Sequence, residues 1–82
     1  MEHSLKPWST ESQTLKKGRY QHYKGTVYNV LHVGRCEETL REVVIYQNED
    51  KKEEVWVRLL SVFLENVDFK GDVVPRFAYS PK

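Results

Sequence analysis

The chain has 82 residues, of which 30% are charged, and its 13 Lys and Arg against 12 Asp and Glu leave a formal net charge of +1. A chain of this length forms one small domain, its one cysteine, Cys36, excludes an internal disulfide framework, and no apolar run approaches the ~20 residues of a membrane-spanning helix. Because the first residues also lack the apolar stretch of a signal peptide, we expect a soluble cytoplasmic protein without a membrane partner.

The first residues, 1–14, are polar and aperiodic, with Leu5 and Trp8 as their large apolar side chains. Ordering a segment costs about 1–2 kcal/mol per residue in backbone entropy, and this one offers little apolar surface to offset that cost. We therefore predict a disordered N-terminal tail over 1–14 and a single β-barrel domain over 17–79.

A series of short strands follows the tail. The β-branched and aromatic residues that favour strands gather in runs, and turn residues such as Lys24-Gly25 and Gly34 separate them. The predicted strands cover 18–23, 26–33, 42–46 and 54–59, and a polar connection over 47–52 joins the last two.

The remaining elements are a helical turn and two short strands. Residues 60–64 are expected to be helical, because Leu60, Phe63 and Leu64 recur at the i, i+3, i+4 spacing. Strands are expected over 67–69 and 73–77. Short strands in so small a domain hide their edges best by closing on themselves. We therefore predict a mainly β fold, a small SH3-like barrel of about five strands with one helical turn, and keep an open α+β sheet as the alternative.

The expected core takes an apolar side chain from each successive element: Val30, Val44 or Ile45, Val57 and Phe63. The third strand is apolar at both parities, so the pattern leaves the choice between Val44 and Ile45 open. On the fourth strand, placing Val57 inside would turn its neighbours outward.

Short motifs follow one another along the folded part in a specific order and spacing. They are Gly18-x-Tyr20-x-His22-Tyr23-Lys24-Gly25, Tyr28-x-Val30, Glu38-Thr39, Val43-Val44-x-Tyr46, Trp56-Val57-Arg58, Phe63 and Pro75-Arg76-Phe77. From about Lys17 to Phe77 the chain resembles the bacterial family catalogued as domain of unknown function 1653. The resemblance implies a small SH3-like barrel and assigns no activity. The chain departs from the family pattern at Cys36-Glu37, where His-Ser is usual, at Leu59, where Pro is usual, and at Val62, where Met is common.

The residues give weak support to catalysis or metal binding. A nucleophile–base site needs a Cys or Ser beside a His, and Cys36 with His22 or His32 is the candidate pair. A metal site would draw on the same three residues and Glu38, which lack the close spacing of a zinc motif. We expect no cofactor, no metal and no catalytic residue. A small enzyme or accessory domain that uses His22 and Cys36 is the alternative.

Aromatic and Arg residues favour a binding function instead. Planar rings beside guanidinium groups suit peptide carboxylates, nucleobases and phosphates. The expected binding surface consists of Tyr20, His22, Trp56, Arg58 and Arg76. We expect a peptide or protein partner, with a nucleic acid as the alternative that the near-neutral charge favours less. A purely structural role also stays open, in which Trp56 caps the barrel and Arg58 pairs with a carboxylate such as Glu38 or Glu65.

Overall fold

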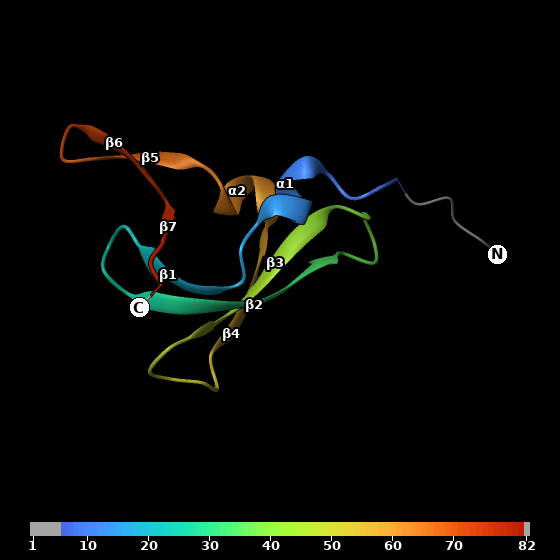
Figure 1. Ribbon diagram of the computed structural model, residues 1–82, viewed down its shortest axis with the longest axis horizontal. Helices are drawn as coiled ribbons and strands as arrows, with labels where there is room; N and C mark the ends of the chain where they lie inside the picture. Colours follow the sequence, from blue (N-terminus) through green and yellow to red (C-terminus); the bar gives the residue numbers. More distant parts are fainter. Residues whose placement is uncertain (1–5, 82) are drawn as a thin grey trace.

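The computed structural model describes residues 6–81 (Figure 1). In chain order its elements are α1 (Thr10–Thr14), β1 (Gly18–His22), β2 (Val27–Arg35), β3 (Glu42–Asn48), β4 (Val55–Leu59), α2 (Leu60–Phe63), β5 (Asn66–Phe69), β6 (Asp72–Pro75) and β7 (Phe77–Tyr79). The strands are antiparallel and the helices are short, so the predicted mainly β class is confirmed. Neither helix of this range is long and apolar enough to cross a membrane.

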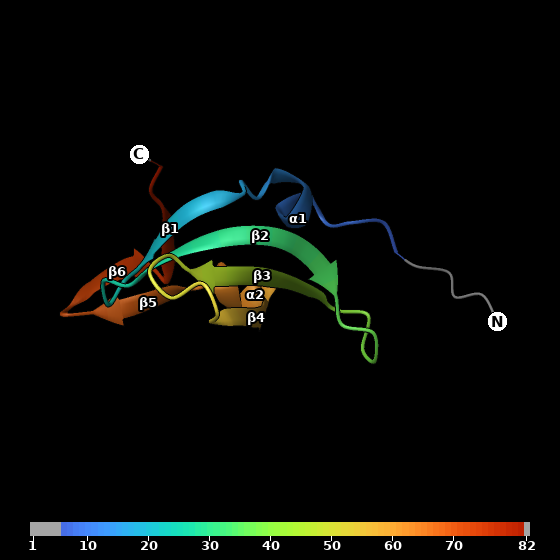
Figure 2. The same cartoon turned by 90° about the horizontal axis from the view of Figure 1, so that it is seen from below.

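Five strands form one sheet in the order β4-β3-β2-β1-β7, and β5 and β6 pair separately as a hairpin. Figure 2 shows the strands β1 to β4 as a curved layer, with the β5–β6 hairpin at the end of the molecule opposite α1. Within residues 6–81, β4 and β7 are the two end strands, so the ladder does not close into a barrel. The five-strand unit is therefore an open, curved sheet.

The second strand is longer than predicted. Gly34, expected to end it, pairs with Val43 instead, and β2 continues to Arg35. A Cβ built at Gly34 would lie 3.4 Å from Ile45 Cδ1, which is van der Waals contact with the outer-face side chain of β3. Here glycine is part of the sheet and not a turn.

One face of the five-stranded sheet, which we call the inner face, carries the core. Directly paired residues on neighbouring strands project to the same side of a sheet. The buried residues on or against this face are Tyr20, Val30, Val44, Tyr46, Leu60, Phe63 and Phe77. Phe63 of α2 is 1% exposed and stacks on Phe77, with ring centroids 4.2 Å apart. The predicted core positions Val30, Val44 and Phe63 are confirmed.

Val57, also predicted in the core, is 64% exposed, and that prediction is wrong. Val57 pairs with Ile45, and both lie on the opposite, outer face, whereas Val44 pairs with Arg58 and Tyr46 pairs with Trp56 on the inner face. The physical cause is the position of α2. This helix follows β4 directly and turns back over the inner face, where Phe63 packs 5.6 Å from the Tyr46 ring.

Residues 1–5 of the predicted tail lie outside the described range, and residues 6–14 contact the sheet through Trp8 and Ser9. Ser9 caps α1, since its Oγ accepts a hydrogen bond from the Ser12 N–H at 3.1 Å. The Ser9 N–H and hydroxyl donate to the two carboxylate oxygens of Glu42 at 2.8 and 2.5 Å. The Arg35 guanidinium lies over the Trp8 ring at 4.3 Å. These polar and cation–π contacts order a segment whose hydropathy shows no periodicity.

Candidate functional site

The five residues predicted to bind a partner occupy different environments. Tyr20 is 6% exposed and belongs to the core. Its hydroxyl donates to the Lys16 carbonyl oxygen at 2.7 Å, and burial raises the pKa of the phenol. Tyr20 therefore has little surface to offer a partner, and its place in the binding surface is not supported.

Arg76 joins three parts of the chain. Its Nη2 donates to Glu65 Oε1 at 3.1 Å, and its backbone N–H donates to the Glu65 carbonyl oxygen at 2.9 Å. Its carbonyl accepts the Tyr23 N–H at 3.0 Å. Arg76 thereby connects the segment after α2 to β7 and to the turn after β1. Glu65, one of the carboxylates considered for Arg58, is paired with Arg76 instead.

The other three predicted residues lie on the inner face together with two aromatic core residues. We call the set His22, Tyr46, Trp56, Arg58 and Phe77 the arginine–aromatic face. Arg58 Nε donates to the Tyr46 hydroxyl at 3.1 Å, and its Cζ lies 5.9 Å from the Phe77 ring centroid. The His22 ring meets the same phenylalanine edge-on at 4.9 Å. Trp56 is paired with Tyr46 on the end strand and is 49% exposed.

Arg58 is half-buried, and no carboxylate in residues 6–81 pairs with it. Its two terminal nitrogens form no hydrogen bond with residues 6–81. The one hydrogen bond that the side chain makes there is donated by Nε. A guanidinium presents its donors as a planar fork that matches a carboxylate or a phosphate. Arg58 is therefore oriented by Tyr46 and Phe77 while its anion-binding end is unused.

His22 reports the electrostatics of this face. Its pKa is lowered, first by burial of the ring and then by the positive charges of Arg58, Arg76 and Lys24. The Nδ1 atom accepts the Lys24 N–H at 3.1 Å, so the imidazole is held as an acceptor. All the charged groups that perturb His22 are cations. The surroundings of Arg58 are thus electropositive although the whole chain is near neutral.

The fold separates His22 from Cys36, the pair named for the enzyme alternative. The His22 N–H donates to the Thr26 carbonyl just before β2, whereas Cys36 follows directly after it. Nine strand residues at about 3.3 Å each put roughly 30 Å between the two ends. The pKa of Cys36 is lowered, mainly by a hydrogen bond with the Thr39 side chain, and His22 is not among the groups that perturb it. Across residues 6–81, no three His, Cys, Asp or Glu gather closely enough to hold a metal ion.

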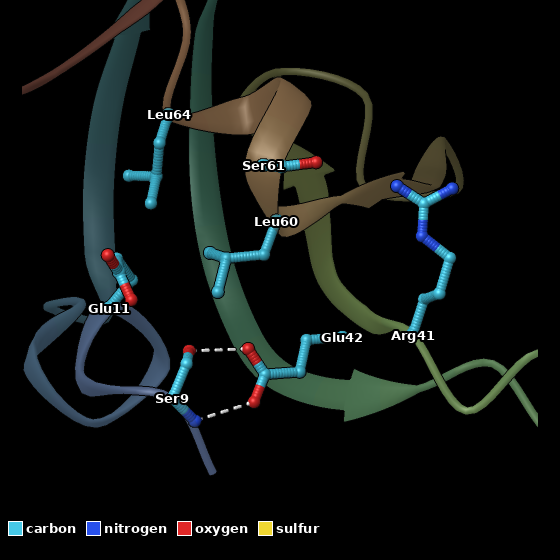
Figure 3. Close-up of a pocket in the computed structure, with 7 residues that line it drawn as sticks. All are labelled: Ser9, Glu11, Arg41, Glu42, Leu60, Ser61 and Leu64. Carbon is cyan, nitrogen blue, oxygen red and sulfur yellow. Dashed lines mark hydrogen bonds between the residues drawn. The ribbon is translucent and has the colours of Figure 1, made fainter.

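A pocket of about 590 Å³ opens between α1, α2 and the start of β3 (Figure 3). Its lining residues are Ser9, Glu11, Arg41, Glu42, Leu60, Ser61 and Leu64. Both carboxylate oxygens of Glu42 are occupied by Ser9, and Figure 3 shows the Arg41 side chain extending away from that pair. No sequence motif indicated this pocket, because its walls come from three segments that only the tertiary structure brings together.

Residues 18–79 match the model of a family described as protein of unknown function DUF1653. A crystal structure of a DUF1653 protein from Bordetella bronchiseptica is 35% identical to the chain and superposes with a TM-score of 0.77, and the match covers 87% of this chain and 99% of that one. A search of the curated proteins found no match. The matched range begins at β1 and ends at β7, so it contains the whole arginine–aromatic face.

Proposed function

The chain belongs to the DUF1653 family of proteins of unknown function, and we propose that it is a non-enzymatic binding module for a peptide or protein segment that carries carboxylates. The arginine–aromatic face is the surface that would bind this segment. One observation carries the proposal: Arg58 is half-buried, oriented, and without a carboxylate partner in residues 6–81.

The terminal nitrogens of Arg58 are not among the buried unpartnered atoms of residues 6–81, so they are open to solvent and to an incoming anion. Arg58 has a hydroxyl and an aromatic ring beside it, which orient the guanidinium without neutralising it. A ligand carboxylate would supply the missing charge and two parallel hydrogen bonds. Arginine in such a site is more specific than lysine, because only the planar fork forms the bidentate pair.

The neighbouring groups favour an anionic segment with an apolar or planar side chain. Arg76 and Lys24 add to the positive field that lowers the His22 pKa. Trp56 offers an exposed ring at the margin of this face, and such rings concentrate binding energy at interfaces. A peptide that places a carboxylate at Arg58 and an apolar side chain at Trp56 would use both.

A nucleic acid fits less well. Glu53 and Glu54 directly precede β4, so negative charges lie in sequence next to Trp56. Phosphate chains bind through many Lys and Arg contacts, and the net charge of +1 gives no general excess. The surface therefore suits one or two carboxylates better than a polyanion.

The experiment uses short extended peptides in matched pairs, in which the acidic member carries Asp or Glu and its partner carries Asn or Gln. Binding to the full chain is followed by the backbone amide shifts in NMR spectra. We expect the acidic members to shift residues of the arginine–aromatic face and the amide members to bind at least about tenfold more weakly, since they lose the charge-assisted pair. Arg58→Lys should weaken binding nearly as much as Arg58→Ala.

Arg41→Ala is the matched control, because Arg41 is an exposed arginine outside this face. Equal binding of acidic and amide peptides would refute the carboxylate proposal, as would an Arg41→Ala effect as large as that of Arg58→Ala. Tighter binding of a single-stranded oligonucleotide than of any acidic peptide would favour the nucleic-acid alternative. A collapse of the unfolding midpoint in Arg58→Lys would make Arg58 a structural partner of Tyr46.

A further inference from the structure

The His22 side chain is held in one orientation on the inner face. His22 pairs directly with Phe77 of β7, and its ring meets the Phe77 ring edge-on at 4.9 Å and the uncharged ring of Tyr23 at 4.5 Å. Its Nδ1 accepts the Lys24 N–H at 3.1 Å, so the neutral imidazole carries its proton on Nε2. A second proton would occupy Nδ1 and remove this acceptor from the Lys24 amide.

Cations face this ring from each element packed against it. Arg58 comes from β4, Arg76 precedes β7, and Lys24 lies in the turn after β1; all three lower the His22 pKa, after the larger effect of burial. Glu65 pairs with Arg76 and compensates for that one charge. None of the groups of residues 6–81 that shift the His22 pKa is a carboxylate. The imidazole is thus kept neutral partly by charges that a bound anion would offset.

Arg58 and His22 contact the same phenylalanine. Arg58 Cζ lies 5.9 Å from the Phe77 ring centroid, and the His22 ring packs on that ring from 4.9 Å. The guanidinium and the imidazole are therefore at most about 11 Å apart, and charges in a partly buried site interact over such a separation with less screening than in bulk solvent. A carboxylate on the Arg58 fork consequently also acts on His22.

We propose that His22 couples ligand binding to protonation: when the carboxylate of an acidic segment binds Arg58, His22 takes up a proton from solvent. Acidic segments then bind more tightly as pH falls from about 7.5 to about 5.5, the range in which histidine is the side chain that ordinarily changes its charge. This inference rests on the proposed function, because it needs a carboxylate at Arg58.

The direction of the effect follows from the charges around the imidazole. In the free chain a proton on His22 joins three cations, whereas in the complex it also faces the ligand carboxylate. The His22 pKa is therefore higher in the complex than in the free chain. By linkage, binding strengthens as pH falls through the higher pKa of the complex and levels off below the lower pKa of the free chain. A rise of one pKa unit gives at most about tenfold tighter binding.

Calorimetric titration of the full chain with a histidine-free acidic peptide and its amide partner tests this coupling. The peptide carboxylate stays ionised between about pH 5.5 and about pH 7.5. We expect the acidic peptide to bind at least about threefold more tightly at the lower pH, and the amide peptide to show no such gain. In buffers with different ionisation heats, the acidic peptide should take up a fraction of one proton on binding near about pH 6.5.

An NMR titration of the wild-type chain locates the proton. Saturating acidic peptide should raise the His22 pKa, and the Lys24 amide shift should follow the same midpoint because that amide loses its acceptor at Nδ1. His22→Asn should bind the acidic peptide without pH dependence, since asparagine takes up no proton while its side-chain oxygen can still accept from Lys24. His32→Gln is the matched control, because His32 pairs with Ile45 on the outer face, and it should keep the pH dependence.

The outcomes separate this inference from the proposed function. An acidic peptide that binds through Arg58 equally well at each pH, and leaves the His22 pKa unchanged, would overturn the coupling and leave the proposed function intact. Failure of every acidic peptide to bind at any pH would overturn both. A pH dependence that persists in His22→Asn, or disappears in His32→Gln, would assign the proton to another group and overturn the coupling. The wild-type titration decides the question even where His22→Asn lowers the unfolding midpoint.

Discussion

Truncating Phe63 is the most direct perturbation of the core that holds the arginine–aromatic face. The side chain is 1% exposed, stacks on Phe77 at 4.2 Å and meets the Tyr20 ring edge-on at 5.4 Å. Phe→Ala substitutions at such sites cost about 3–5 kcal/mol, which combines lost burial with the cavity left behind. A domain of 82 residues has a total stability of about 4–12 kcal/mol. Phe63→Ala should therefore remove a large share of the free energy of unfolding.

Urea unfolding followed by far-UV circular dichroism measures this loss. Phe63→Leu should lose less than Phe63→Ala, because it keeps most of the buried apolar surface. Val57→Ala is the informative control. Sequence reasoning placed Val57 in the core as well, but at 64% exposure its truncation should cost less than about 1 kcal/mol. Similar losses for Phe63→Ala and Val57→Ala would refute the assignment of the inner and outer faces.

Two further predictions concern titratable groups. The Glu42 pKa is lowered, mainly by the Ser9 hydroxyl, so this contact stabilises the fold above about pH 4.5, and the stabilisation is lost as pH falls through the lowered folded pKa. Ser9→Ala should therefore cost about 1 kcal/mol of the free energy of unfolding at neutral pH. Glu42→Gln should flatten the acid dependence of the unfolding midpoint. The His22 pKa is also lowered, so protonation opposes folding and stability should decrease as pH falls below about 6.5. Arg58→Ala should raise the His22 pKa in an NMR titration, and an unchanged His22 pKa would contradict the electropositive face.

Arg58 and Arg76 illustrate how one fold uses similar side chains differently. Arg76 is committed to Glu65 and to backbone bonds that tie three segments together, so its removal should mainly affect folding. Arg58 keeps its terminal nitrogens uncommitted toward residues 6–81. The distinction depends on which arginine Glu65 reaches. Because Glu65 follows α2 and pairs with Arg76 just before β7, it leaves Arg58 without a carboxylate partner in residues 6–81.

The attached N-terminal segment adds a feature that lies outside the family match, which begins at Gly18. Ser9 and Glu42 join α1 to the start of β3, and Trp8 packs on Arg35 at the end of β2. These contacts lie at the end of the sheet opposite the β5–β6 hairpin (Figure 1). The segment therefore stabilises one end of the sheet and leaves the β4 edge uncovered.

Local pattern was enough to determine the class of the fold and the approximate positions of the elements from β1 to β5. It did not predict α1, and the one strand predicted over 73–77 corresponds to β6 and β7. Runs of β-branched and aromatic residues marked the strands, and the i, i+3, i+4 spacing of Leu60, Phe63 and Leu64 marked the helical turn at α2. Val30, Val44 and Phe63 were predictable as core residues because large apolar groups at these positions have few alternatives in so small a domain. The sequence did not predict the contacts of residues 6–14 with the sheet, because polar capping and pairing leave no hydropathy period.

Tertiary structure alone decided which side of the sheet is inside. Alternation with a period of two sorts the residues of a strand into two sets but does not say which set is buried. β3 is apolar on both sides and β4 carries valines on one side, so the pattern favoured a core at Val57. The packing of α2 over Val44 and Tyr46 reversed that choice and brought Arg58 onto the inner face. A charged residue thus entered a half-buried position because its strand neighbours, not its own hydropathy, determined the face on which it lies.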